Sequence, residues 1–235
     1  MQELGNSEAD SSGLGSYLMK SVPRAEEYKS GGVRSYFDNK EAWIEKYVHP
    51  SGRTRDWELV VDELDNEQIY TWPLFTDSFC NEVIQLAEDT GNWVKDRHEF
   101  YPTTDKVLMQ FGMDKIYSDI LREFVYPAAI HLYELAGKDW ENLKFENFIA
   151  KYEPNNQPSL GIHHDTSLIT ALVNLSQVGE DFEGGGTFFK KQKITAQPPK
   201  GYVSLHPGNI THKHGARPTT RGTRHIIVSF SSFID

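Results

Sequence analysis

Cysteine is almost absent from this chain of 235 residues, which contains Cys80 alone. A single cysteine cannot form an internal disulfide, so a reducing compartment is expected, although a fragment of a secreted protein has the same composition. No run approaches the roughly 18 consecutive apolar residues of a transmembrane helix, which predicts no membrane span. The N-terminus also lacks the apolar segment that a signal peptide needs.

Basic residues are few, since 24 lysines and arginines stand against 34 aspartates and glutamates, for a formal net charge of −10. This balance disfavours nucleic-acid binding, which needs a basic surface. It favours cationic partners or simple solubility. With 38% apolar and 12% aromatic residues, the composition is that of a globular protein.

The chain divides into a polar lead-in and one domain. Residues 1–35 are rich in serine, glycine and glutamate without periodicity, which is typical of a flexible linker. Residues 36–235 are then expected to form a single domain with a sizeable core.

Helical patterns come first in this domain. Apolar spacing predicts a helix from a cap at Thr76 to Gly91, and a second helix that stops before Pro127. A third helical segment is expected to end at Gly137, a residue suited to the position after a helix.

The second half of the domain is a series of short strands separated by turn signals such as "PNNQP" and "EGGG". Many short strands at this spacing favour a sandwich or a jelly roll. The sequence therefore predicts an α+β fold in which N-terminal helices support a β-rich half. The predicted strands are 145–152, 167–175, 186–190, 201–206 and 224–233.

Two histidines and an aspartate stand where one of these strands begins, in "LGIHHDTSLITALVNL". In an extended stretch His163 and Asp165 point to the same side, and either His212 or His214 offers a third ligand. Two histidines and one carboxylate form the facial triad of non-haem Fe(II) oxygenases, which leaves positions open. Taken alone this H-x-D pattern is weak, because a histidine in a strand is more often an ordinary core or surface residue.

Arg224 strengthens the case, because it follows His214 at the start of the apolar strand "HIIVSF". A guanidinium buried there needs a partner, and its planar fork matches a carboxylate. That carboxylate belongs either to one of the chain's own acids or to a bound ligand.

Four stretches of this half resemble the catalytic domain of the procollagen lysyl hydroxylases: "YEPNNQPSLGIHHD", "DFEGGGTFF", "LHPGNITHKHG" and "PTTRGTRHIIVSF". Upstream stretches such as "YPTTDKVLMQFG" fit less closely, so the resemblance spans about residues 65–233. A giant-virus member is one candidate for the nearest relative. The family implies a double-stranded β-helix, or jelly roll, that uses Fe(II), 2-oxoglutarate and O2, with ascorbate as a candidate reductant.

Carried over by position, the resemblance makes His163, Asp165 and His214 the iron ligands and Arg224 the anchor for 2-oxoglutarate. His212 stays open as the rival third ligand. Asn147, Lys151 and Tyr152 lie on the preceding strand, and Asn147 and Tyr152 are expected to touch the cosubstrate. The run "EGGG" is expected to form a turn or bulge beside the site.

The implied reaction is hydroxylation of lysine at C5 in collagen-like X-Lys-Gly sequences, with succinate and CO2 as coproducts. The family also implies a homodimer. The lysine ammonium needs a carboxylate or aromatic partner, for which the candidates are Asp105, Glu99 and Trp93.

Two departures from the family bear on localisation. Thr187 stands where animal relatives carry a cysteine, and the glycosyltransferase-like domains of those relatives are missing, which suggests an excised domain. The family favours the lumen of the endoplasmic reticulum, whereas the single cysteine and a viral relative favour a host cytoplasm or a virion.

Two other functions stay open. A peptidyl-prolyl hydroxylase of the same superfamily uses the same metal motif, although collagen-type prolyl hydroxylases tend to carry lysine at the position of Arg224. A non-catalytic jelly-roll module that binds collagen would share the fold without turnover.

Overall fold

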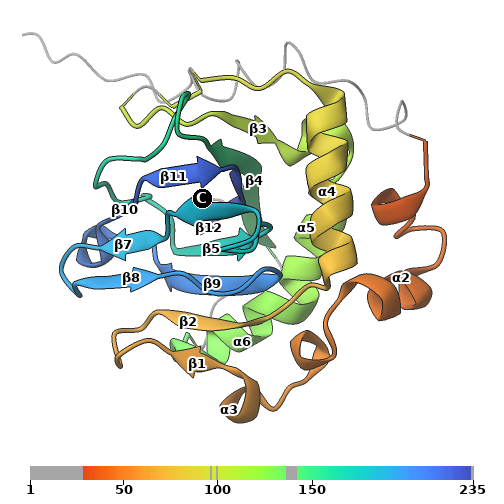
Figure 1. Cartoon of the computed structure of the whole chain (residues 1–235). Helices are drawn as coiled ribbons and strands as arrows, with labels where there is room; N and C mark the ends of the chain where they lie inside the picture. The colour runs from red at the N-terminus through yellow and green to blue at the C-terminus, as the bar shows by residue number, and fades with distance from the viewer. Residues whose placement is uncertain (1–28, 96, 99, 136–141, 234–235) are drawn as a thin grey trace, which may run out of the picture.

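The computed structural model describes residues 29–95, 97–98, 100–135 and 142–233. Most of the lead-in predicted for residues 1–35 therefore lies outside the described residues. The described chain consists of a β-rich body with helices gathered along one side (Figure 1). None of its helices combines the length and the apolar character that a bilayer crossing needs.

A seven-stranded antiparallel sheet forms the centre of the fold, in the order β1-β2-β9-β5-β12-β4-β3. The long strands β4 and β12 pair along their whole length, from Arg224 opposite Tyr152 to Phe233 opposite Leu143. The strands are β1 (Asp62–Glu63), β2 (Tyr70–Pro73), β3 (Asp105–Val107), β4 (Leu143–Tyr152), β5 (Ile169–Asn174), β9 (Tyr202–Pro207) and β12 (Arg224–Phe233).

Side-chain alternation gives this sheet two different faces, because successive residues of a strand point to opposite sides. Ile149, Val173 and Leu205 point into the large core shared with the helices. Phe148 and Leu172 point the other way, into a smaller apolar cluster. We call this second side the inner face of the sheet.

Two small sheets lie beyond the inner face and complete the jelly roll that the sequence predicts. One has the order β10-β7-β8 and the other pairs β11 with β6. Their strands are β6 (Phe182–Gly184), β7 (Thr187–Phe189), β8 (Ile194–Ala196), β10 (His214–Ala216) and β11 (Thr219–Gly222).

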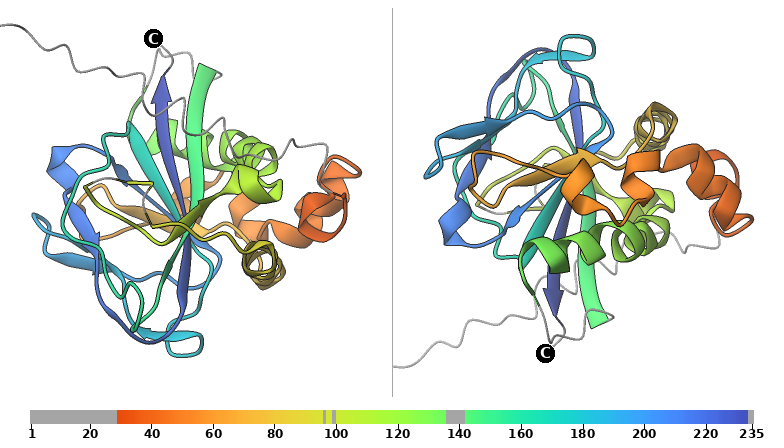
Figure 2. Two further views of the ribbon diagram at one scale, coloured as in Figure 1. Left: turned by 90° about the horizontal axis from the view of Figure 1, so that it is seen from above. Right: turned by 90° about the horizontal axis from the view of Figure 1, so that it is seen from below.

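The helices cover the other face of the large sheet, as the two end-on views show (Figure 2). α4 begins after Thr76 and ends at Gly91, as predicted, and it buries Phe79, Val83 and Ala87 along one side. The helices are α2 (Lys40–Tyr47), α3 (Trp57–Val60), α4 (Asp77–Thr90), α5 (Asp114–Ile120), the π-helix η5 (Leu121–Val125) and α6 (Tyr126–Leu132), with short 3-10 turns η2 (Gly32–Arg34), η3 (Pro50–Arg53), η4 (Leu108–Phe111) and η7 (Ile210–His212).

The helical series expected to stop before Pro127 ends at Val125, but α6 follows it without a break. The helical path continues from α5 through η5 into α6, and Pro127 occupies the first turn of α6. A proline is tolerated in a first turn, where its missing N–H is not required by the helix. Gly137, the expected end of the last helix, lies outside the described residues, and α6 ends at Leu132.

The division into a helical first half and a β-rich second half is also too simple. Strands β1, β2 and β3 come from the first half and form both edges of the large sheet. They are two to four residues long, and Pro73 interrupts the pattern of β2, so no alternation of useful length marks them in the sequence.

Candidate active site

His163 and His214 are joined by their backbones. The N–H of His163 donates to the carbonyl of His214 over 2.8 Å, and the N–H of His214 donates back over 2.9 Å. This reciprocal pair is an isolated antiparallel bridge between the segment before β5 and the start of β10. Two parts of the chain that are distant in sequence are thereby held side by side.

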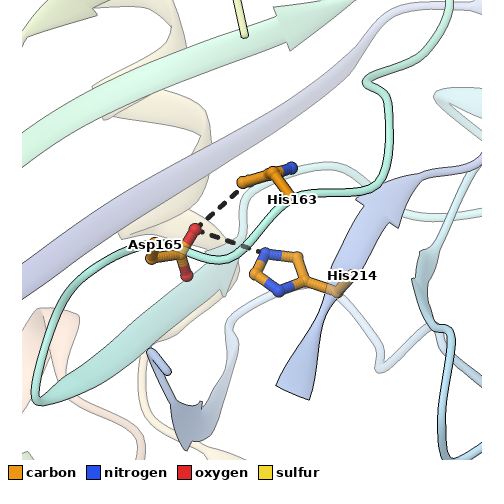
Figure 3. A group of neighbouring side chains, drawn as sticks. All are labelled: His163, Asp165 and His214. Carbon is orange, nitrogen blue, oxygen red and sulfur yellow. Dashed lines mark ion pairs between the residues drawn. The ribbon is translucent and has the colours of Figure 1, made fainter. Parts of the chain in front are cut away.

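Asp165 completes the group two residues after His163. One of its carboxylate oxygens, Oδ1, lies 3.2 Å from Nε2 of His163 and 3.5 Å from Nε2 of His214. The three potential ligand atoms all lie within 4.8 Å of one another. Figure 3 shows both imidazoles directed at the same oxygen of Asp165. The structure therefore brings together the three residues predicted as metal ligands.

The protonation of these side chains suits a metal. Nδ1 of His163 faces the carbonyl of Gly161 at 2.8 Å, and Nδ1 of His214 faces that of His212 at 3.0 Å. A carbonyl only accepts, so each Nδ1 donates its proton there, and Nε2 is the ring nitrogen of each histidine that is available to a metal. This is the tautomer in which histidine binds metals.

The surroundings of Asp165 favour the ionised form of its carboxylate. Burial opposes its ionisation, yet His214, His163 and the hydroxyl of Thr170 together hold the pKa of this carboxyl well below its usual value. Burial lowers the pKa of His214, which keeps its imidazole neutral. A deprotonated carboxylate beside a neutral imidazole is the donor set that a divalent metal requires.

The rival ligand, His212, is engaged elsewhere. Its Nε2 lies 2.9 Å from the carbonyl oxygen of Glu67, and its Nδ1 lies 2.8 Å from the hydroxyl of Thr211. Both ring nitrogens therefore have partners outside the triad. His164, the middle residue of the H-x-D motif, is exposed, whereas His163 and Asp165 are partly buried.

Arg224 is buried on the inner face at the start of β12. Its guanidinium donates to the carbonyl of Gly186 and to the hydroxyl of Thr187, both over 3.3 Å. No carboxylate of the described chain pairs with it, and burial lowers its pKa. An uncompensated buried cation of this kind fits the carboxylate of a bound ligand.

The glycine run lies against this arginine. A Cβ added to Gly185 would stand 2.8 Å from the Phe182 ring and 3.3 Å from Cδ of Arg224, and Gly186 has a φ of +92°. Only glycine permits this close approach and this backbone conformation without strain. The glycine run, for which a turn or bulge is expected, links β6 to β7 beside Arg224.

Asn147 does not belong to the site, and its predicted contact with the cosubstrate is wrong. Its side-chain amide donates to Asp114 and to Ser118 of α5, each over 2.9 Å. The residue points to the helix-covered face of β4, opposite to the inner face. Tyr152 does lie on the inner face, where the guanidinium of Arg224 is 5.7 Å from its ring centre.

The described candidates for binding the lysine ammonium have other partners. Asp105 is completely buried and accepts from Arg97 over 2.7 Å and from Thr103. The indole of Trp93 donates to Glu88 over 3.1 Å. Glu99 lies outside the described residues.

Two neighbours of the triad, His206 and Tyr101, are not predicted from the sequence. His206 at the end of β9 is completely buried, with Nδ1 3.0 Å from the carbonyl of Pro207 and Nε2 3.9 Å from Oδ2 of Asp165. Burial lowers its pKa to about 3, which leaves the ring neutral. The alternation of side chains in the predicted strand 201–206 is the sequence feature that could have indicated that His206 points inward.

Tyr101 is the second neighbour. Its ring centre lies 4.9 Å from that of His163, and the side chain is partly exposed. It precedes β3 in the loop, where no periodicity of the sequence indicates which residue reaches the site.

The arrangement has a defined chemical capacity. Two imidazole nitrogens and one carboxylate oxygen on one side of a metal leave its remaining positions open for exchangeable ligands. The buried guanidinium nearby supplies a fixed positive charge for an anionic ligand.

Comparisons with known proteins agree with a metal site of this kind. Residues 141–232 match the model of the 2OG-Fe(II) oxygenase superfamily. The chain is 38% identical over 205 residues to the multifunctional procollagen lysine hydroxylase and glycosyltransferase LH3 of Rattus norvegicus, covering 83% of this chain and 27% of that protein. It is 35% identical to procollagen-lysine,2-oxoglutarate 5-dioxygenase 1 of Gallus gallus, with 83% and 28% covered. The chain thus spans about a quarter of the length of these curated relatives.

Solved structures share the fold at lower identity. The 2OG complex of the viral collagen prolyl hydroxylase vCPH from Paramecium Bursaria Chlorella virus-1 superposes with a TM-score of 0.54 at 18% identity, covering 73% of this chain and 98% of that one. A prolyl-4-hydroxylase of Pseudomonas putida gives 0.52 at 11% identity, with 79% and 99% covered.

Proposed function

We propose, from the match of residues 141–232 to the model of the 2OG-Fe(II) oxygenase superfamily, that the chain belongs to this superfamily and hydroxylates peptidyl lysine at C5 in collagen-like X-Lys-Gly sequences. Membership implies Fe(II), 2-oxoglutarate and O2, and the coproducts are succinate and CO2. The choice of lysine is supported by the names of the curated relatives, which are 34–38% identical to this chain. The prolyl hydroxylase structures at 18% and 11% identity support the fold alone.

The observation that carries this proposal is the unpaired buried charge of Arg224 on the same inner face as the triad. A site for a metal alone does not need a buried guanidinium. A cosubstrate with a carboxylate at each end gives this cation its partner, while its other end reaches the metal. The hydroxyl of Thr187 fixes one edge of the guanidinium and so directs the fork.

His163, Asp165 and His214 would hold the iron, which supplies the oxidation chemistry when it is bound. The three residues present their donor atoms to one point, which would leave the remaining positions of the metal for exchangeable ligands. The partly exposed ring of Tyr101 lies against the ring of His163. The apolar cluster of Phe148, Leu172 and Ile226 lines the inner face and limits the access of water to the cosubstrate.

Ascorbate, as a reductant that keeps the iron ferrous, and a homodimeric state are further parts of the proposal. Sedimentation velocity over a range of protein concentrations tests the dimer. A single monomeric species at every concentration would remove that part while leaving the catalytic proposal intact.

The experiment that tests the reaction is mass spectrometry of two matched peptides after incubation with Fe(II), 2-oxoglutarate and the full chain. One peptide carries lysine and the other proline at the same position of a collagen-like repeat. We expect a 16 Da gain on lysine, assigned to C5 by fragmentation, together with succinate. A gain on proline alone would make the chain a prolyl hydroxylase, and no succinate with either peptide would contradict catalysis.

A further inference from the structure

The two oxygens of Asp165 have different surroundings. Oδ1 faces both histidine Nε2 atoms, as the paired dashed lines in Figure 3 show. Oδ2 points away from them and accepts a hydrogen bond of 2.6 Å from the hydroxyl of Thr170. The carboxylate is therefore held with one oxygen toward the metal position and the other turned from it.

Thr170 belongs to a rigid part of the molecule, whereas Asp165 lies in the loop before β5. Thr170 is completely buried on the inner face and pairs across β5 and β9 with His206. The backbone of the loop is fixed by hydrogen bonds from Asp165 and Thr166 to the carbonyl of Gly208. These bonds position the backbone of Asp165 but leave its carboxylate free to rotate, because that torsion has a broad profile.

The direction of each hydrogen bond around Thr170 is determined by its partners. A carboxylate only accepts, so the Thr170 hydroxyl donates to Oδ2 of Asp165. The hydroxyl of Ser167, 2.7 Å from that of Thr170, then donates to Thr170. The ordered chain Ser167 to Thr170 to Asp165 gives the carboxylate one preferred orientation.

His206 does not replace this bond. Its Nε2 stands 3.9 Å from Oδ2, beyond hydrogen-bond length, and its Nδ1 proton is directed at the carbonyl of Pro207. The ring fills the space behind the carboxylate without fixing its rotation.

We propose that Thr170 is a positioning residue for the metal centre: its hydroxyl holds Oδ2 of Asp165 away from the metal, so that Asp165 binds through Oδ1 alone. A carboxylate that bound through both oxygens would occupy one of the positions that the cosubstrate and O2 require. This inference rests on the metal-binding part of the proposed function.

The test compares Thr170→Val, which removes the hydroxyl and preserves the shape, with Thr170→Ser, which retains the hydroxyl. Thr219→Val is the matched control, because Thr219 is equally buried but its hydroxyl has no partner in the described chain. Affinity for Co(II) is measured by competition with a chelator, in the absence of cosubstrate and peptide, together with the visible absorption of bound Co(II).

We expect Thr170→Val to weaken Co(II) binding about 10- to 100-fold, the usual cost of removing a partner of a metal ligand, and to alter the absorption spectrum. Thr170→Ser and Thr219→Val should keep the affinity and spectrum of the unaltered chain. Thermal unfolding without metal checks folding, and Thr170→Ala, which also lacks the hydroxyl, must show the same loss if Thr170→Val does not fold.

Two results would overturn the inference. Binding of Co(II) by Thr170→Val with unchanged affinity and spectrum would show that the hydroxyl does not position Asp165. An equal loss in Thr170→Ser would assign the effect to packing. If the unaltered chain bound no Co(II), the proposed function itself would fail, which is a distinguishable outcome.

Discussion

Asp165 is the one charged ligand of the centre, and its environment is built for a cation that binds between it and the two histidines. Without a metal, its buried carboxylate is stabilised by the neighbouring His214 and His163 and by the hydrogen bond from Thr170. The side chain therefore serves the site more than the fold. The same reasoning applies to Arg224, whose burial costs free energy that a ligand recovers.

Asp165→Ala is expected to weaken metal binding more than about 100-fold, since a ligand matters more than the partner of a ligand. Turnover should fall below detection, while the metal-free variant should still fold and unfold cooperatively, because a side chain directed at a ligand site contributes little packing. Chelator competition and circular dichroism measure the two effects. Global unfolding of the variant would show that Asp165 is structural.

Arg224→Ala is expected to raise the apparent requirement for 2-oxoglutarate on the order of 10- to 100-fold, since a charge-assisted hydrogen bond contributes about 1.5–3 kcal/mol. The requirement for the peptide should stay unchanged. Steady-state succinate formation, with each substrate varied in turn, measures both. Arg221→Ala, which removes an exposed ion pair with Glu183, is the control, and equal effects on both substrates would contradict the assigned role.

At the scale of elements, α4 is fastened to the helix-covered face of the sheet by Glu88. Its carboxylate lies 2.9 Å from Nε2 of His225 on β12 and 3.2 Å from Nζ of Lys151 on β4. The hydrogen bond with His225, followed by that with Lys151, lowers the pKa of Glu88 to about 2. This contact ties the helix to the two longest strands of the sheet, and His225 is next to Arg224 in sequence.

The lowered pKa of Glu88 predicts an acid dependence of stability. Because the folded-state pKa lies below the unfolded value of about 4.3, the contribution is complete above that value and is lost as the pH falls toward 2. The difference in unfolding free energy between the unaltered chain and Glu88→Gln should therefore shrink between pH 5 and pH 2. Urea denaturation across this range measures it.

The control for that experiment is Asp89→Asn, which alters an exposed neighbour on the same helix. Its unfolding free energy should follow that of the unaltered chain at each pH. A difference for Glu88→Gln that stayed constant down to pH 2 would contradict the ionic role of Glu88.

The sequence predicted the features that depend on residues close together in the chain, and it did not predict those that depend on contacts between distant residues. The strand containing Tyr152 and the pairing of His163 with Asp165 follow from local alternation, and both were predicted. Alternation also separated Asn147 from Tyr152, but it does not say which face of a strand meets the helices. That choice is made by α5, whose Asp114 binds Asn147, and no local pattern contains this contact.

On the scale of the whole molecule, the centre joins the large sheet to the smaller ones. His163 precedes a strand of the large sheet, whereas His214 begins a strand of the sheet β10-β7-β8. A metal held by both residues cross-links the two layers of the jelly roll, so its binding should stabilise the folded chain as a unit.

Saturation with metal at about 100 times its dissociation constant should add about 2.7 kcal/mol of stability. For a domain of this size the unfolding midpoint should rise by on the order of 5–10 °C. Differential scanning calorimetry with Co(II), and again after a chelator is added, measures the shift. Asp165→Ala should show none, and an equal shift in that variant would place the metal elsewhere.

The reciprocal backbone bridge between His163 and His214 has a consequence for the newly made chain. Several strands lie between His163 and His214 in the sequence. The two ligands therefore meet, and can bind the ion, only after these strands have paired and the sheets have packed together. Metal uptake should then be among the last events of maturation. In refolding with Co(II), its visible colour should lag behind the far-ultraviolet signal of the backbone, and a nascent chain should leave the ribosome without metal.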